Sequence, residues 1–256
     1  MHHRKLHPAA IVAMATALIF PGGFALDASD LDSRIEASAK ASYNFKTYLK
    51  DDSIKVKSAG GAVTLSGTVS QDYHKSLAQE TVAGLPGVKS VTNGLAVVGD
   101  QPTEPSDGWI SLKVKAALAF HKNVKATDIS VQTEDGVVTL TGHADSEAHK
   151  ELAGEYAKDV EGVRTLRNQL VVATGEPVAQ PLAEKVDDAS ITAQVKTALL
   201  FHKSTHALAT KVATTKGVVT LRGEAVNEAE KDLVTKLAED IEGVKRVNNR
   251  MSVRKS

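Results

Sequence analysis

Apolar residues in the middle of the chain recur first at the spacing of a helix and then at the spacing of a strand. Ile110, Val114, Ala117 and Leu118 follow helical spacing and predict a helix that ends near Phe120. Residues 129–142 alternate between apolar and polar on either side of a turn at 134–136, which predicts a β-hairpin with one buried face. A second helical pattern covers 147–160, and a last alternating run covers 163–172. This order, α-β-β-α-β, predicts two helices packed on one face of a three-stranded sheet.

Single residues mark the expected ends of these elements. Asp107 precedes the first helix and is a good candidate for its N-cap. Gly142 is expected to end the hairpin, at a turn where the backbone tolerates no side chain. Gly162 is expected to close the second helix in the left-handed conformation.

The same pattern occurs three times, with offsets of 75 and 81 residues and with all variation in length confined to the connectors. Each copy is a unit of about 65 residues, which is large enough to fold alone and longer than most solenoid repeats. We therefore expect three similar domains on a string. The residues that recur at fixed spacing are Gly67, Gly142 and Gly223; Gly87, Gly162 and Gly243; Asn93, Asn168 and Asn249; and Phe45, Phe120 and Phe201.

These patterns predict an α+β protein made of three tandem two-layer αββαβ sandwich domains, over residues 33–98, 109–172 and 190–254. The polar, proline-containing connectors 99–108 and 173–189 are expected to be semi-extended. Residues 1–25 combine a basic start, an apolar run and a small-x-small end, which is the pattern of a cleaved secretory signal peptide. The sequence therefore predicts export to the periplasm.

Composition excludes several classes of function. The chain has no cysteine and equal numbers of basic and acidic residues, and loss of Arg4 and Lys5 with the signal peptide leaves a net charge of −2. Neither a basic excess nor many aromatic residues support nucleic-acid binding. No hydrolase, zinc-protease or phosphate-loop motif is present. We therefore expect a non-enzymatic protein without a cofactor.

The motif Gly-x-Val-x-Leu-x-Gly, followed about twenty residues later by Gly-Val and then by an asparagine, resembles the BON domain. It stands here as Gly136–Gly142 and Gly162–Asn168, with parallels in both other copies, and the resemblance covers nearly all of residues 33–254. The resemblance implies a secreted envelope protein that binds phospholipid and acts in envelope maintenance or osmotic stress. A chaperone-like binder of unfolded envelope proteins and a structural adaptor of an envelope machine remain alternatives, and the oligomeric state stays open.

The recurrent glycines and asparagines are most simply structural. Gly67, Gly142 and Gly223 could form a phosphate-binding turn, but no glycine-rich fingerprint with a basic partner accompanies them. The asparagines at 93, 168 and 249 are expected to hydrogen-bond nearby backbone.

The first helix of the second copy carries the strongest candidate for a contact surface. Trp109, the only tryptophan, and Leu112 lie off its apolar stripe, and lysines lie close by. Tryptophan and lysine together suit the headgroup level of a membrane, and the resemblance places contact with anionic lipid on the same helix. The alternative is that Trp109 packs against a neighbouring domain. The candidate residues are Trp109, Leu112, Lys113, Lys115, Lys122, Lys196 and Lys203.

Histidines offer weaker candidates. His121 and His202 could bind metal, but a helix C-terminus also favours a His-Lys pair. His143 and His149 lie near Asp145 and Glu147, where helix capping explains the pattern better than a zinc site does. We therefore expect no metal site.

Overall fold

The computed structural model describes residues 28–99, 106–172 and 185–254, which we call repeats one, two and three. The signal peptide expected at 1–25 lies outside the described residues, as does most of both connectors.

Repeat two shows the order of elements that the sequence predicts. Its first layer holds α4 (Asp107–Leu118) and α5 (Glu147–Lys158). In the second layer, β5 is the central strand, antiparallel to β4 and parallel to β6. A 3-10 turn, η1, precedes β4, and a short strand, β7, extends the pairing of β5. The remaining bounds are η1 (Ala126–Asp128), β4 (Ile129–Glu134), β5 (Val137–Ala144), β6 (Thr165–Asn168) and β7 (Val171–Val172).

Repeats one and three have the same topology, with the second strand in the centre of each sheet. The α+β class and the two-layer arrangement are therefore confirmed. Repeat one consists of α1 (Ala28–Ala41), α2 (Tyr43–Thr47), β1 (Ser53–Ala59), β2 (Ala62–Val69), α3 (Asp72–Ala83) and β3 (Ser90–Val97). Repeat three consists of α6 (Asp188–Phe201), η2 (Ala207–Ala209), β8 (Lys211–Thr215), β9 (Val218–Arg222), β10 (Glu224–Ala225), α7 (Glu228–Glu239), β11 (Arg246–Asn249) and β12 (Ser252–Val253).

Several boundaries differ from those expected. Ser106, not Asp107, is the N-cap of α4, because its hydroxyl accepts a hydrogen bond from Trp109 N. Gly142 lies within β5 and does not end it, since pairing with β4 continues through this residue. Gly162 has the expected positive φ of 89°, but α5 already ends at Lys158.

The first helix of repeat one is also interrupted. α1 ends at Ala41 and α2 begins at Tyr43, with Ser42 between them. The Ser42 hydroxyl donates to the Ala39 carbonyl at 2.7 Å. A side-chain bond of this kind competes with the helical backbone ladder, which explains why the helix breaks here.

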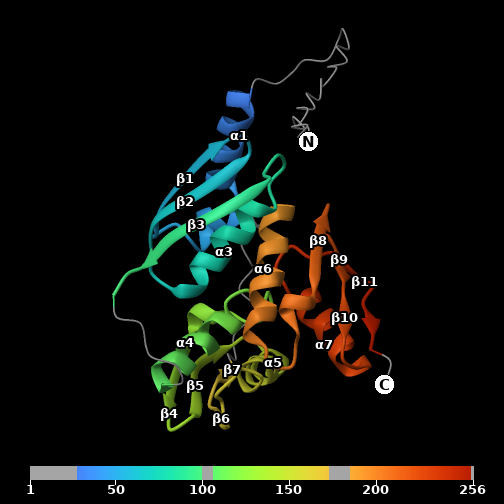
Figure 1. Ribbon diagram of the computed structural model, residues 1–256. Coiled ribbons are helices and arrows are strands. Elements are labelled where there is room, and N and C mark those ends of the chain that lie inside the picture. The colour runs from blue at the N-terminus through green and yellow to red at the C-terminus, as the bar shows by residue number, and fades with distance from the viewer. Residues whose placement is uncertain (1–27, 100–105, 173–184, 255–256) are drawn as a thin grey trace, which may run out of the picture.

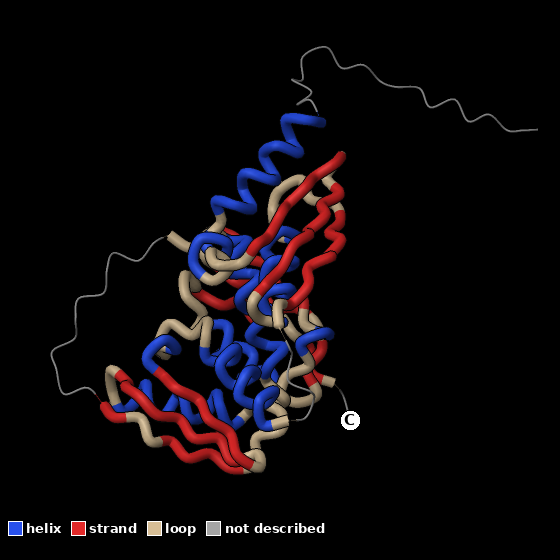
Figure 2. Tube along the Cα trace, turned by 90° about the vertical axis from the view of Figure 1, so that its left-hand side faces the viewer, coloured by secondary structure: helices blue, strands red, loops and turns tan. Residues whose placement is uncertain are grey.

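The three repeats pack together, which is a point that the sequence leaves open. The helices gather in the middle of the molecule and the sheets lie on the outside (Figures 1 and 2). Buried residues of all three repeats form one continuous hydrophobic cluster. The apolar surface of each repeat is therefore covered by its neighbours as well as by its own two layers.

Helix α6 occupies the centre of this packing (Figure 1). Ten of its fourteen residues are buried, and it lies against α3 of repeat one as well as against its own sheet. On the α3 side, the Lys196 ammonium lies 2.6 Å from the Glu80 carboxylate. Most of this helix is covered, and repeat one provides part of the cover, so repeat three depends on repeat one for burial.

Aromatic side chains from all three repeats meet beside α6. Phe120 is only 1% exposed, and its ring lies edge-on to Tyr48 and Tyr73 of repeat one, with centroids 5.1 and 5.9 Å apart. Tyr73 also contacts Phe201 of repeat three at 6.1 Å. Burial raises the pKa of Tyr73 to about 12. The recurrent phenylalanines at 120 and 201 therefore join the repeats.

Candidate functional site

The first helices of the three repeats lie in different surroundings. α6 is enclosed on nearly all sides, whereas α1 buries only Ile35 and Ala39. α4 is intermediate, because its inner face is buried while its outer face remains accessible. The outer face of α4 is where the sequence places the strongest contact candidate.

Trp109, Leu112 and Lys115 lie along this outer face, the first two half-buried and Lys115 exposed. The Lys113 ammonium lies 3.8 Å from the centroid of the Trp109 ring, which is the geometry of a cation–π contact, and 3.6 Å from the Glu161 carboxylate. We call Trp109, Leu112, Lys113 and Lys115 the α4 face.

The tryptophan ring is held by its own repeat. A Cβ added at Gly162 would lie 3.8 Å from Trp109 Cζ3 and 2.9 Å from Ile110 Cγ1. The absence of a side chain at Gly162 therefore lets the start of α4 approach the loop after α5. These contacts of Trp109 lie within repeat two, as does its contact with Lys113.

The other three candidate lysines connect repeats. Lys122 Nζ donates to the Glu239 carbonyl at 2.5 Å, and Lys203 Nζ donates to the Lys158 carbonyl at 3.1 Å. Lys196 pairs with repeat one, as described above. These three lysines make contacts within the molecule, as Lys113 does with Glu161, and Lys115 is exposed.

Two histidines form reciprocal contacts between repeats two and three. His121 Nδ1 of repeat two lies 3.1 Å from Asp240 Oδ2 of repeat three. In return, His202 Nδ1 of repeat three lies 3.2 Å from Asp159 Oδ2 of repeat two. An antiparallel backbone bridge accompanies each pair. The two repeats therefore contact each other through equivalent residues. The contacts are reciprocal, as they are across an approximate two-fold axis.

These histidines do more than end a helix, because both residues are only 3% exposed and their side chains face the other repeat. His121 stacks on Tyr156, with centroids 3.8 Å apart, and Tyr156 donates to Asp240 at 2.8 Å. Burial lowers the pKa of His121, against the opposing effect of Asp240. Burial, and then the Asp240 charge, raises the pKa of Tyr156. A neutral imidazole is therefore favoured at position 121.

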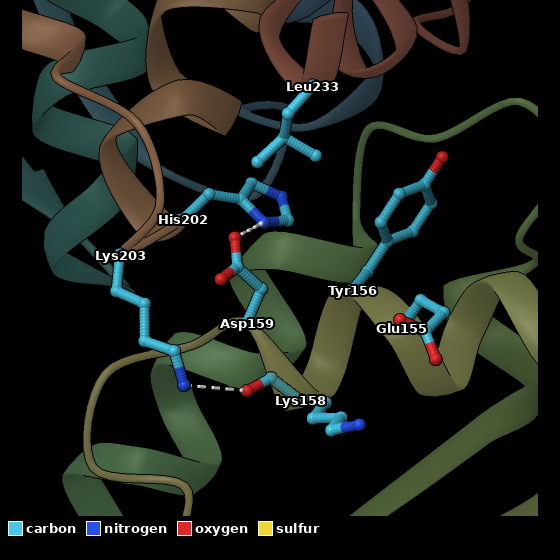
Figure 3. Close-up of a pocket in the computed structure, with 7 residues that line it drawn as sticks. All are labelled: Glu155, Tyr156, Lys158, Asp159, His202, Lys203 and Leu233. Carbon is cyan, nitrogen blue, oxygen red and sulfur yellow. Dashed lines mark hydrogen bonds and ion pairs between the residues drawn. The ribbon is translucent and has the colours of Figure 1, made fainter. Parts of the chain in front are cut away.

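A pocket of about 340 Å³ lies beside this interface. Figure 3 shows the His202 ring at its edge, bonded to Asp159, with Lys203 bonded to the Lys158 carbonyl. Burial favours a higher pKa for Asp159, but hydrogen bonds from His202 and Ser204 outweigh it and hold that pKa below its usual range. The His202 imidazole and the Lys203 ammonium at this pocket are thus already engaged in contacts between repeats. Its lining comprises Glu155, Tyr156, Lys158, Asp159, His202, Lys203 and Leu233.

Across residues 28–99, 106–172 and 185–254, no three His, Asp or Glu side chains converge as metal ligands. His149 lies near Asp145, but at 4.0 Å. Within the same ranges, no helix has the length and apolar character needed to cross a bilayer.

Comparison with known protein families identifies the same three repeats. A model of the BON domain matches residues 31–99, 106–174 and 187–255, which together make up most of the chain. The chain belongs to the BON domain family.

Curated BON relatives include the osmotically-inducible protein Y of Escherichia coli (strain K12). It is 39% identical over 143 residues, which cover 56% of this chain and 70% of that protein. The outer membrane lipoprotein DolP of Haemophilus influenzae is 29% identical over 144 residues, covering 56% of this chain and 72% of DolP. These names place relatives of this BON protein in osmotic stress and at the outer membrane.

A solved structure that covers most of this chain is CdsD, a structural protein of the type III secretion system of Chlamydia trachomatis. It is 18% identical, covers 87% of this chain and 91% of that chain, and has a TM-score of 0.24. We draw nothing from a similarity this low.

The recurrent asparagines of the three BON repeats tie the last strand to the second helix. Asn168 Nδ2 donates to the Lys150 carbonyl of α5 at 2.6 Å, and its Oδ1 accepts from Leu170 N at 3.3 Å. Asn93 and Asn249 make the matching bonds in their own repeats. Each asparagine therefore hydrogen-bonds a backbone carbonyl of the second helix and the backbone amide two residues after itself.

One aspartate also recurs in all three repeats, and the sequence pattern did not reveal its role in a turn. The Asp107 carboxylate accepts hydrogen bonds from Asp135 N and Gly136 N, which closes the turn between β4 and β5. Asp32 and Asp188 make the same contacts in the other BON repeats. The signal was available, because these aspartates are separated by the repeat offsets of 75 and 81 residues.

Proposed function

We propose that this protein is a non-enzymatic, periplasmic envelope protein that binds the surface of anionic phospholipid membranes through the α4 face. The observation that carries the proposal is the difference between the first helices. α6 is buried among the repeats, whereas α4 keeps a half-buried tryptophan and an exposed lysine on its outer side. Membership of the BON family, with relatives named for osmotic induction and the outer membrane, supports the location and the role in envelope stress.

The chemistry of the α4 face suits the headgroup region of a bilayer. An indole ring prefers the boundary between the acyl chains and the headgroups, where its apolar body and its N–H are both accommodated. Lys115 is exposed and can approach lipid phosphates, and each such cation near an anionic surface contributes about 1 kcal/mol. Contact of this kind is peripheral and weak, so it would be sensitive to salt.

The test is co-sedimentation of the mature protein with anionic and with zwitterionic vesicles. The variant Leu112→Ser with Lys115→Glu changes the outer side of α4 and leaves Trp109 in place. It should weaken binding to anionic vesicles by about tenfold or more, since it removes one cation, adds an anion and removes an apolar contact. The control, Val171→Ser with Arg167→Glu, makes the same chemical changes at exposed positions of the same repeat. Equal binding of both variants to anionic vesicles would refute the α4 face as the site.

A chaperone-like function would need an apolar groove for unfolded chains. The large apolar side chains exposed in the described ranges are isolated residues, namely Val98, Val171, Leu200 and Val226. Scattered residues of this kind are normal on soluble proteins. Phospholipid therefore remains the better supported partner.

A further inference from the structure

Three cations stand in one row across the outer face of the sheet in repeat three. Lys211 on β8 pairs directly with Arg222 on the central strand β9. Arg250 follows Asn249, which pairs with Leu221, and its amide donates to the Leu221 carbonyl at 2.8 Å. Arg250 therefore lies beside Arg222 on the other side. Because adjacent strands are about 4.8 Å apart, the three side chains arise within a span of about 10 Å.

All three side chains point away from the helices. They are exposed, and they alternate with residues that face the helical layer, such as Val212, Leu221 and Met251. Across the described ranges, no carboxylate pairs with any of the three and no side-chain hydrogen bond holds them. By contrast, the nearby Arg254 pairs with Glu224 at 3.1 Å. The row is therefore a concentration of uncompensated positive charge.

Repeat two shows that the fold does not require this charge. The matching residues of repeat two are Ser130, Thr141 and Gln169, on the same strands and in the same register. All of them are neutral. Like charges placed opposite each other on neighbouring strands destabilise a sheet. Repeat three therefore carries an unfavourable arrangement that repeat two avoids.

A lysine on an edge strand is often explained as protection against edge-to-edge aggregation. This explanation covers Lys211, because β8 is the edge strand of its sheet. It extends to Arg250, which directly follows β11 at the other edge, but it does not cover Arg222, which lies on the central strand. The row as a whole needs another reason.

We propose that this row, which we call the β9 row, is a second membrane contact that binds the anionic headgroups of a phospholipid bilayer. A row of cations on a flat sheet complements an extended anionic surface, whereas a single free phosphate needs donors that converge in a concave site. The other outward residues of these three strands include Ala213, Thr220 and Val218, with Arg246 and Asn248 on β11. The face thus lacks the aromatic platforms with which single-stranded nucleic acids are bound.

The β9 row lies apart from the α4 face. Figure 1 places β8, β9 and β11 on the opposite side of the molecule from α4, and Figure 2 shows the helices between the outer sheets. The proposal shares only the class of partner with the proposed function. The two surfaces can therefore be tested separately by substitution.

The decisive variant transfers the neutral row of repeat two onto repeat three: Lys211→Ser, Arg222→Thr and Arg250→Gln. The control, Lys40→Gln, Lys50→Gln and Lys236→Gln, removes the same net charge from exposed positions outside the sheets. Both are compared with the unmodified mature chain by co-sedimentation with anionic and zwitterionic vesicles at low and physiological salt. A further arm adds inorganic phosphate at matched ionic strength, and thermal unfolding is measured for every variant.

We expect the row variant to bind anionic vesicles at least tenfold more weakly than the control, with a smaller salt dependence. Its melting temperature should equal or exceed that of the unmodified chain, because a like-charge row has been removed. Equal binding of the two variants would overturn the proposal, as would displacement by inorganic phosphate, which would indicate a site for the free anion. Loss of binding in the α4-face variant alone would support the proposed function and refute the β9 row.

Discussion

Gly67 lies where β2 passes close to the start of β1. Its φ is +112°, and a Cβ added there would lie 1.9 Å from the Ser53 carbonyl oxygen. Gly142 and Gly223 repeat this approach, with distances of 2.0 and 2.2 Å to the matching carbonyls. The glycine is therefore needed for the close pairing of the two strands, and no ligand is required to explain it.

Replacing Gly67 by alanine should lower the free energy of unfolding by about 3 kcal/mol or more, because backbone must move to admit the methyl group. Gly60→Ala is a matched control from the same hairpin. Its φ is also positive, at +59°, but a Cβ there meets nothing within 4 Å. The control should cost only about 1 kcal/mol. Urea unfolding measures both variants, and similar losses would show that φ alone, not the carbonyl contact, demands glycine at Gly67.

At the scale of elements, α6 is held to repeat one by a buried polar network. Asn44 of α2 donates through Nδ2 to Thr81 Oγ1 at 2.8 Å and to the Ser190 carbonyl at 3.2 Å. Its Oδ1 accepts from Gln194 Nε2 at 2.7 Å. Asn44, Ser190 and Gln194 are completely buried. Such a network fixes one angle and one register between α6 and repeat one.

Asn44→Ala should therefore destabilise the protein by about 2 to 4 kcal/mol, since it leaves Gln194 Nε2 without a partner in the interior and removes the hydrogen bond that Thr81 Oγ1 accepts. Asn248→Ala, at a half-buried outward position on β11, should change stability by less than about 0.5 kcal/mol. The comparison is made by chemical denaturation of the whole chain. A loss below about 1 kcal/mol for Asn44→Ala would mean that water or rearrangement satisfies the freed groups.

The helices and strands could be predicted from the sequence, because the spacing of apolar residues depends on contacts within one repeat. The helices and strands of repeat two appear where the spacing of Ile110, Val114 and Leu118 and the alternation around Val138 predict them. The burial of α6 was also signalled, because a helix with one charged residue, Lys196, after its first turn is apolar on most sides.

Contacts between repeats could not be read in this way. Lys196 lies beside Glu80, which is 116 residues away, and no local pattern pairs them. For the same reason, the sequence offers Lys122 and Lys203 as candidate contacts for a partner but does not predict that each donates to a main-chain carbonyl of the facing repeat. Local pattern identifies exposed cations but not the long-range neighbours that engage them.

At the scale of the whole molecule, repeats two and three contact each other through two equivalent His–Asp pairs. Each repeat contributes the histidine to one pair and the aspartate to the other. Repeat one has Lys46 and Gly84 at the positions of the histidine and the aspartate, so it cannot form the same interface. It joins the others through α2, α3 and its tyrosines instead. The three copies of one fold have thus diverged at the residues that decide which copy binds which.

This interface should make stability depend on pH. The folded pKa of His121 is lowered by burial, so the unfolded chain takes up the proton first as pH falls below about 6.5. The stabilising contribution is therefore complete above that pH, and it is lost progressively as pH falls toward the folded pKa. The groups that face the imidazole are Asp240, Tyr156 and His202.

The measurement is the free energy of unfolding by urea at pH 7 and at pH 5. His121→Phe keeps a ring that can stack on Tyr156 but cannot titrate, so the fall in stability between the two pH values should be smaller than in the unmodified chain. His143→Gln removes an exposed histidine on β5 and should leave the fall unchanged. His74 also has a lowered pKa, caused first by burial, and contributes a fall of the same sign in all three proteins. An equal fall in His121→Phe and the unmodified chain would show that the interface between repeats two and three does not sense protonation at this position.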